Sequence, residues 1–283
     1  MTEFLPLAEA IRKHVPDGAS VALEGFTHLI PFAAGHELIR QGRQRLHLIR
    51  MTPDLIYDQL IGMGAARRLT FSWGGNPGVG SLHRLRDAVE QGWPRPLELD
   101  EHSHAGMAAG YRAGAARLPF GTLRGYIGTD LPKHNPNIRS VRCPYTGEEL
   151  ATVPALNPDV TILHAQRADR RGNVAIEGII GAQREAGLAA GFLIVTVEEI
   201  VDELPPAMNG VLLPHFTVGA ISHCPGGAWP SYAQGRYARD NDFYLRWDDI
   251  ARDRDRFTGW MKQHVLGTTD HRGFLESLRR AAA

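Results

Sequence analysis

Two carboxylates and two imidazoles lie together in the segment 99–104, Leu-Asp-Glu-His-Ser-His. A carboxylate in this segment could serve as a nucleophile, as a base or as a group that orients another side chain. An H-x-H pair beside carboxylates could also bind a metal ion, but no distal ligand motif accompanies it, so no metal site is predicted. The remaining alternative is that the segment only caps a following helix.

Four glycines occupy the segment 72–81, Ser-Trp-Gly-Gly-Asn-Pro-Gly-Val-Gly-Ser, ahead of an amphipathic stretch. Backbone N–H groups in such a loop can form an anion-binding nest at a helix N-terminus. The segment lacks both the Lys-Ser/Thr of a P-loop and the spacing of a dinucleotide-binding motif, so no nucleotide is implied. A glycine-rich connector without any ligand is the alternative.

Two further segments carry unusual residues where an apolar run ends. In 24–28, Glu-Gly-Phe-Thr-His, the glycine lets a backbone N–H approach a ligand oxygen closely, although a tight turn explains it equally well. The segment 164–173 contains three arginines and ends on the turn residues Gly172-Asn173. Its arginines could meet a phosphate or a carboxylate, and a basic turn in solvent is the alternative.

Short apolar runs rich in Val, Ile, Leu and Phe precede these segments and are too short for helices, which predicts strands. The predicted strands are 20–26, 46–51, 68–73, 96–101, 159–165 and 192–197. Amphipathic stretches between them predict helices from near Pro31, over 54–63 and over 81–91. Ser81 is expected to cap the last helix and Gly92 to stop it.

This alternation predicts an α/β fold with an open, mostly parallel sheet and helices on both faces. Ligands bind such sheets at the carboxyl ends of the strands, where the four segments lie. We expect a single domain over 1–283. The region 121–157 breaks the rhythm with prolines and polar turns, as an excursion or a small β-subdomain. A helical tail from about 242 is expected to pack Trp247, Ile250, Phe257, Trp260, Met261 and Leu266.

The composition is that of a soluble protein without a strongly charged partner. Lys plus Arg and Asp plus Glu are both 31, so neither nucleic acid nor a membrane surface is expected as a partner. No apolar stretch approaches the roughly 20 residues of a membrane span, and the N-terminus has no signal-peptide pattern. The two cysteines, Cys143 and Cys224, stand far apart and predict buried or semi-buried thiols in a reduced, cytoplasmic protein.

The run Asp17-Gly18-Ala19-Ser20-Val21-Ala22-Leu23-Glu24-Gly25-Phe26, with Pro31 after it, is similar to the N-terminal signature of family I CoA-transferases. That signature has Asp-Gly, two spacers, three apolar residues, Gly-Gly-Phe and a later Gly-x-Pro. Here Glu24 replaces the first glycine, and Leu29-Ile30-Pro31 replaces Gly-x-Pro. These departures resemble the glutaconate CoA-transferase branch, as do 168–173 and 195–201. The resemblance runs from Leu7 to about Leu266.

Longer segments resemble a subfamily of that branch: GFTHLIP, IRMTPDLIYDQLIG, FSWGGNPGVGSLHRLRDAVEQGWP, DEHSHA and RYARDNDFY. They are similar to the A subunits of 3-oxoadipate CoA-transferases of bacterial aromatic degradation. The resemblance implies an enzyme that moves CoA from succinyl-CoA to a 3-oxo dicarboxylic acid. It also implies that CoA thioesters are substrates and that no cofactor stays bound.

In this family a glutamate attacks the acyl-CoA, forms a mixed anhydride and then holds CoA as an enzyme thioester. The resemblance places that glutamate in a separate B subunit, with two or four A–B pairs in the enzyme. It implies that this chain supplies the other wall of the site through Gly25, Phe26, Thr27, Arg50, Ser72, Gly74, Gly75, Asn76 and Gln166. Glu101 is the functional carboxylate expected here, because a related hydrolase branch that opens carbon rings uses a glutamate at the corresponding place.

Three alternatives stay open. The chain could belong to a CoA-thioester hydrolase or C–C lyase that uses Glu101 and water, or it could be the A subunit of a glutaconate CoA-transferase. It could also be a non-catalytic subunit that binds CoA esters. A neighbouring gene for a B subunit with an active-site glutamate favours transfer, whereas a B subunit without it favours the hydrolase.

Overall fold

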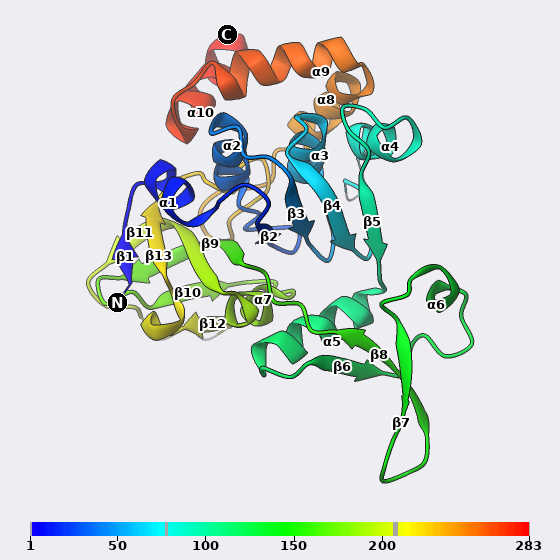
Figure 1. Ribbon diagram of the computed structural model, residues 1–283. Coiled ribbons are helices and arrows are strands. Elements are labelled where there is room, and N and C mark those ends of the chain that lie inside the picture. The colour runs from blue at the N-terminus through cyan, green and yellow to red at the C-terminus, as the bar shows by residue number, and fades with distance from the viewer. Residues whose placement is uncertain (1, 77–78, 206–208, 283) are drawn as a thin grey trace.

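The computed structural model describes residues 2–76, 79–205 and 209–282. The strands of its main sheet are β1 (Glu3–Phe4), β2 (Ser20–Glu24), β3 (Leu46–Ile49), β4 (Ala66–Phe71), β5 (Glu98–Glu101), β9 (Val160–Asp169), β10 (Val174–Glu177), β11 (Phe192–Val201), β12 (Gly210–Leu213) and β13 (Ala220–His223). Eight of them lie in the order β1-β13-β11-β9-β2-β3-β4-β5 (Figure 1). Neighbours along this path are parallel, whereas β10 pairs antiparallel with both β9 and β12.

The helices around this sheet are α1 (Leu7–His14), α2 (Phe32–Arg40), α3 (Leu55–Gly62), α4 (His83–Glu90), α5 (His104–Ala115), α7 (Gln183–Ala189), α8 (Asn241–Arg252), α9 (Arg254–Trp260) and α10 (His271–Ala282). They cover both faces, as alternate residues of one strand show. Val21 and Leu23 of β2 belong to the core under α2 and α3, whereas Ala22 belongs to the core under α5 and α7. The predicted α/β fold is therefore confirmed.

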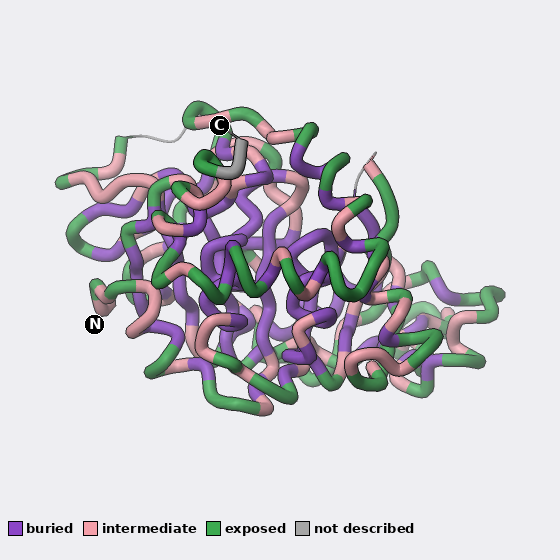
Figure 2. Tube along the Cα trace, turned by 90° about the horizontal axis from the view of Figure 1, so that it is seen from above, coloured by how far each residue is buried: buried purple, intermediate pink, exposed green. Residues whose placement is uncertain are grey.

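The C-terminal helices close the core beside α2 and α3. Trp247, Phe257 and Met261 are fully buried, and the rings of Trp247 and Trp260 have centroids 5.0 Å apart. Leu266 was expected in the same core, but it is 43% exposed because the short helix η2 (Met261–Leu266) ends there. Figure 2 shows the buried residues gathered at the centre of the molecule and the exposed ones around them. Within the described ranges, no helix is both long and apolar enough to cross a lipid bilayer.

The region 121–157 contains a second, antiparallel sheet, so it is an excursion with β-structure of its own. Its elements are β6 (Phe120–Leu123), α6 (Leu131–His134), β7 (Arg139–Arg142) and β8 (Glu149–Pro154), and the strand order is β6-β8-β7. A small core of Tyr126, Ile138 and Val153 packs this sheet against Ala109 of α5. In Figure 1 the β7–β8 hairpin projects away from the main sheet.

Asp100, near the end of β5, ties the small sheet to the large one. One of its carboxylate oxygens accepts hydrogen bonds from the amides of Asn135 and Asn137, at 3.0 and 3.1 Å. The other accepts a hydrogen bond from Arg68 at 2.9 Å. Burial alone would raise the pKa of Asp100, but the hydrogen bonds from His102, Asn137 and Arg68 hold it well below its usual value. The charged carboxylate therefore attaches the segment between α6 and β7 to the end of β5.

The expected cap of α4 is wrong. The helix begins at His83, and Ser81 makes no capping hydrogen bond. Instead, Asp58 on α3 accepts hydrogen bonds from the backbone N–H groups of Arg84 and Leu85, at 2.8 and 2.9 Å. A carboxylate from the neighbouring helix thus satisfies donors that have no partner inside the first turn.

The expected loop 164–173 is also wrong in its first half. β9 continues to Asp169 because it keeps parallel pairing with β11 on one side and gains antiparallel pairing with β10 on the other. The turn itself is short, and Asp169 accepts hydrogen bonds from the backbone N–H groups of Arg171 and Asn173.

Asp58 provides a test of how α3 holds α4. The side chain is fully buried, and burial raises the pKa of Asp58 to about 7 although the N–H groups oppose the rise. The unfolded carboxyl has a pKa of about 4, so the folded chain retains a proton that the unfolded chain releases. This contribution to stability is fully present below about pH 4 and is lost as the pH rises to about 7.

We predict that Asp58→Asn removes this dependence. Between pH 5 and 7 the free energy of unfolding of the wild type should fall relative to that of the variant, by up to about 1.4 kcal/mol per pH unit. Denaturant titrations at several pH values measure the difference, with Asp242→Asn at an exposed position of α8 as the control. Parallel pH profiles of the wild type and Asp58→Asn would contradict the assignment.

Candidate functional site

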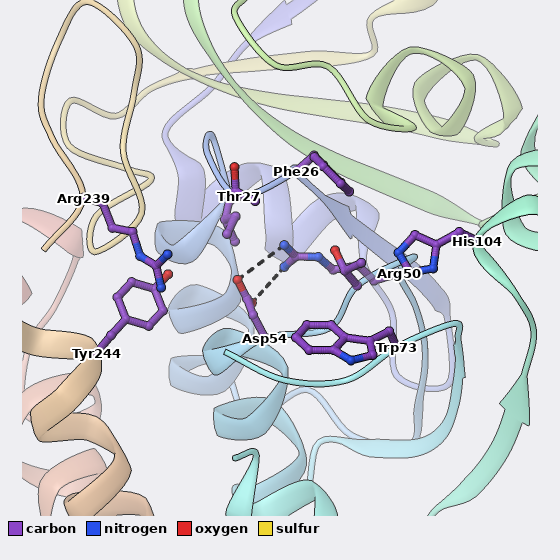
Figure 3. Close-up of a pocket in the computed structure, with 10 residues that line it drawn as sticks. Phe26, Thr27, Arg50, Asp54, Trp73, His104, Arg239 and Tyr244 are labelled. Carbon is purple, nitrogen blue, oxygen red and sulfur yellow. Dashed lines mark hydrogen bonds and ion pairs between the residues drawn. The ribbon is translucent and has the colours of Figure 1, made fainter. Parts of the chain in front are cut away.

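A cavity of about 400 Å³ lies at the carboxyl ends of β2, β3 and β4. This is the edge at which parallel sheets bind ligands. Its walls come from the loop after β2, the β3–α3 connection, the loop after β4, the start of α5, and α8 with the segment before it (Figure 3). The residues that line it are Phe26, Thr27, Ile30, Arg50, Thr52, Asp54, Trp73, His104, Arg239 and Tyr244.

Arg50 lies in the middle of the cavity wall and is 1% exposed. Its Nη1 donates to Asp54 Oδ1 at 3.0 Å, and its Nη2 donates to the carbonyl oxygen of Gly25 at 2.9 Å. The guanidinium carbon also lies 5.4 Å from the ring centroid of Tyr57. Both terminal nitrogens therefore bind the protein itself, so Arg50 positions the loop after β2 and does not offer an open fork to a ligand.

The loop after β2 has a constrained backbone. A Cβ atom on Gly25 would lie 2.7 Å from the carbonyl oxygen of Leu29, so only glycine fits there. Thr27 and Leu29 have positive φ angles of 63° and 51°, which non-glycine residues adopt at a cost. Neighbouring hydrogen bonds hold this shape, since Leu29 N–H donates to the Tyr232 carbonyl and Ile30 N–H donates to Ser231 Oγ.

Glu24 sits behind this loop, away from the cavity lining. Its Oε1 accepts hydrogen bonds from the backbone N–H of Met51 at 3.0 Å and from the hydroxyl of Tyr111 at 2.8 Å. Complete burial raises the pKa of Glu24, while the charge of Arg50 opposes the rise. Glu24 therefore links the ends of β2 and β3 to α5 and is not available to a substrate.

Ser72 and His104 form a polar pair at one side of the cavity. The Ser72 hydroxyl donates to the Met51 carbonyl at 2.6 Å, and its oxygen lies 3.1 Å from His104 Nδ1. Because the single hydroxyl proton goes to Met51, the oxygen accepts a hydrogen bond from Nδ1–H. In the neutral imidazole, Nε2 of His104 is then left as an acceptor.

Arg239 and Tyr244 line the other side of the cavity, and sequence reasoning did not select them. Arg239 precedes α8 and Tyr244 lies within it, so neither belongs to a strand-end loop. The guanidinium carbon of Arg239 lies 4.1 Å from the ring centroid of Tyr244. The signal that could have identified them is the segment RYARDNDFY, which contains both residues.

The structure brings together only part of the predicted site. Phe26, Thr27 and Arg50 line the cavity, Gly25 accepts from Arg50, and Ser72 contacts the lining residue His104. The other predicted site residues lie outside this cavity. Gly74 and Gly75 line a neighbouring cavity of about 450 Å³ that shares Trp73.

Asn76 and Gln166 do not reach the main cavity. Asn76 is buried at the tip of the loop after β4, and its side chain has no hydrogen-bond partner among the residues that the structure describes. The Gln166 amide lies within β9 and exchanges two hydrogen bonds with the backbone of Glu177, at 2.9 and 3.0 Å. Gln166 thus pairs with β10.

Glu101 ends β5 with an exposed side chain and does not line the cavity. Within the segment 99–104, the residue that caps the following helix α5 is Ser103. Its Oγ accepts a hydrogen bond from Gly106 N–H at 3.1 Å. In residues 2–76, 79–205 and 209–282, no group of three or more His, Cys, Asp and Glu side chains is arranged to bind a metal ion.

The Arg50–Asp54 pair gives a test of the scaffold of the site. We predict that Arg50→Met lowers the free energy of unfolding by about 3–5 kcal/mol, because the Asp54 carboxylate stays buried without its cation. Adding Asp54→Leu should recover part of the loss. The matched control is Arg86→Met, which breaks an exposed pair with Glu90 at the same i, i+4 spacing and should change the melting temperature little. Equal losses for the two arginines would show that Arg50 has no special role.

Comparison with known proteins agrees with this geometry. The profile of the family described as Coenzyme A transferase matches residues 4–223. The A subunit of the 3-oxoadipate CoA-transferase of Pseudomonas knackmussii is 63% identical over 274 residues, which is 97% of each chain.

Two solved structures share the fold over most of their length. Glutaconate CoA-transferase from Acidaminococcus fermentans superposes with a TM-score of 0.90 at 28% identity, covering 98% of this chain and 93% of that one. A variant of the decarboxylase AibA/AibB gives a TM-score of 0.81 at 32% identity, covering 92% of this chain and 98% of that one. The resemblance inferred from the sequence is thus confirmed, and the chain belongs to the coenzyme A transferase family.

Proposed function

We propose that this chain is the A subunit of a heteromeric CoA-transferase that moves CoA from succinyl-CoA to 3-oxoadipate in aromatic degradation. The 63% identity to the A subunit of a 3-oxoadipate CoA-transferase supports this assignment. The structural observation that carries the proposal is that the carboxylates in and behind the cavity wall are already paired or hydrogen-bonded. Covalent CoA transfer needs a carboxylate that is free to attack.

No carboxylate that the described residues place in the cavity lining meets this need. Asp54 is the one acidic residue there, and it is paired with Arg50. Glu24 lies behind the loop with its Oε1 hydrogen-bonded to Met51 and Tyr111. The attacking glutamate is therefore expected from the B subunit, with this chain forming the opposite wall of a shared site.

In the proposed reaction, the glutamate of the B subunit first attacks the thioester carbon of succinyl-CoA, which releases the CoA thiolate and leaves a mixed anhydride. The thiolate then attacks the glutamyl carbonyl, which releases succinate and leaves CoA bound as an enzyme thioester. The acceptor repeats the exchange in the opposite direction. We propose that the loop Gly25–Thr27 presents backbone N–H groups to the oxyanion of these steps. Contacts with the rest of CoA would supply the binding energy for the exchange.

The acceptor is proposed to be a dicarboxylic 3-oxo acid. Two arginines and one aspartate line the cavity, which favours an anionic ligand. We expect two or four A–B pairs and a cytoplasmic enzyme, in keeping with the two free cysteines Cys143 and Cys224. Under the hydrolase alternative, the carboxylate of this chain that acts on the substrate is Glu101.

We predict that this chain alone shows no CoA transfer and that co-expression with its B subunit restores it. The reconstituted complex should give a higher kcat/KM with 3-oxoadipate than with glutaconate, and the lowest value with acetoacetate, which lacks a second carboxylate. Thioester exchange from succinyl-CoA, followed by absorbance and mass spectrometry, measures both claims. A variant of the B subunit without its glutamate is the control.

CoA transfer by the isolated chain would overturn the proposal that the attacking glutamate comes from the B subunit. An acetoacetate rate equal to that of the diacids would overturn the substrate claim while leaving the transferase claim standing.

Glu101 provides a separate test. We predict that Glu101→Gln lowers the turnover of the complex without lowering its melting temperature, since the side chain is exposed and makes no cap. Glu98→Gln, at an exposed position of the same strand, is the matched control. If Glu101→Gln keeps wild-type turnover, the residue has no catalytic role. If the complex hydrolyses acyl-CoA through Glu101 without transferring CoA, the hydrolase alternative replaces the proposal.

A further inference from the structure

The loop that follows β2 forms one wall of the cavity with a backbone shape that its residue types do not favour. Thr27 and Leu29 have positive φ angles of 63° and 51°, and neither is a glycine. A side chain makes this conformation costly, so contacts with other parts of the chain have to hold it. His28 lies between these two residues, and Phe26 and Thr27 line the cavity (Figure 3).

The imidazole of His28 is buried and fixed at one of its nitrogens. The residue is 0% exposed, and its Nε2 lies 2.6 Å from the carbonyl oxygen of Ile179. Because a carbonyl oxygen can only accept, Nε2 carries a proton and donates the hydrogen bond. Ile179 is 151 positions further along the chain, in the segment 178–182 between β10 and α7. This bond therefore ties the loop after β2 to a distant segment.

Tyr232 holds the same part of the loop from another side. Its ring stacks on the His28 ring, with centroids 4.9 Å apart and planes at 22°. Its backbone carbonyl also accepts a hydrogen bond from Leu29 N–H at 2.9 Å. Burial lowers the pKa of His28, while the hydrogen bond to Ile179 opposes this change, so the stacked ring is neutral.

Two glycines allow the segment 178–182 to come this close. A Cβ atom on Gly178 would lie 3.0 Å from His28 Cε1, and a Cβ atom on Gly181 would lie 2.8 Å from Phe26 Cβ. Glycine permits such an approach because it has no side chain. The segment thus packs directly against both His28 and the cavity residue Phe26, so a displacement of His28 would also displace the cavity wall.

The wall that His28 holds is the one proposed above to bind the oxyanion through backbone N–H groups. Such donors act only when they are aimed at the developing charge, and a misplacement of about 1 Å can lower a rate by about 100-fold. We propose that His28 is a positioning residue, whose bond to Ile179 and stacking on Tyr232 aim the N–H groups of the loop 25–27 at the thioester oxygen of a bound acyl-CoA. The rate effect rests on the proposed function, whereas the contact with a thioester oxygen does not require transfer.

The first experiment measures transfer by the complex with the B subunit. His28→Phe keeps a flat ring for stacking and removes the donor. It should lower kcat by about 10- to 100-fold and change the KM for succinyl-CoA little, because contacts with the rest of CoA remain. His28→Gln has an N–H group that can reach the Ile179 carbonyl, so it should recover part of the rate.

The matched control is His271→Phe. His271 is also buried and donates through Nε2 to a backbone carbonyl, that of Gly226 at 2.8 Å, but it lies at the start of α10 and does not line the cavity. This variant should lower the melting temperature and leave kcat unchanged.

The second experiment measures the thioester carbonyl directly. A complex whose B subunit lacks its glutamate is mixed with succinyl-CoA that carries ¹³C at the thioester carbon, and difference infrared spectra record the carbonyl stretch. The frequency should be lower with wild-type His28 than with His28→Phe, because well-aimed N–H groups polarise the carbonyl. Tyr232→Leu removes the stacking ring, keeps the His28 bond and should raise the frequency too, which provides the test if His28→Phe does not fold.

The outcomes separate this role from the proposed function. Transfer with the same kcat before and after His28→Phe refutes the positioning role and leaves the proposed function intact. A wild-type complex that transfers no CoA, but polarises the thioester carbonyl through His28, refutes the proposed function and supports the role. Equal losses of kcat for His28→Phe and His271→Phe, or an unchanged carbonyl frequency in the variants of His28 and Tyr232, also refute the role.

Discussion

The functional end of this protein depends on one buried guanidinium group. Arg50 bridges the Asp54 carboxylate at the start of α3 and the Gly25 carbonyl at the end of β2. A charge with 1% exposure is tolerated only when the protein supplies acceptors, so these two groups have to stay in place. The constrained loop from Gly25 to Ile30 and the first turn of α3 are therefore fixed relative to each other, and they form one wall of the cavity.

Short sequence patterns predicted the parts of the structure that are determined by residues close together in the sequence. Apolar runs such as 46–51 identified the parallel strands, and the rule that ligands bind at carboxyl ends identified three segments that contribute to the cavity or its support. The failures came from contacts between distant segments. Asp58 replaces Ser81 at the start of α4, and β9 is lengthened by its pairing with β10. Neither effect is encoded within a window of a few residues.

Arg239 and Tyr244 show the same limit at the site. They reach the cavity because the segment before α8 folds back over the sheet, and no spacing near Arg50 indicates this. Gln166 is the opposite case, since its amide looked available at a strand end but pairs with Glu177 within the sheet. A fold match alone does not settle the chemistry either. A decarboxylase shares this architecture with a TM-score of 0.81, so function has to be argued from the side chains of the site.

The two sources of the cavity wall differ in how freely they can diverge during evolution. Arg50 donates hydrogen bonds to both Gly25 and Asp54, so a substitution at any of the three residues requires compensating substitutions at the others. Arg239 lies on a connecting segment outside the sheet, where a new side chain leaves the strands and their pairing unchanged. Descendants of this gene can therefore change the side chains of the outer wall in single steps, while the inner wall is inherited unchanged.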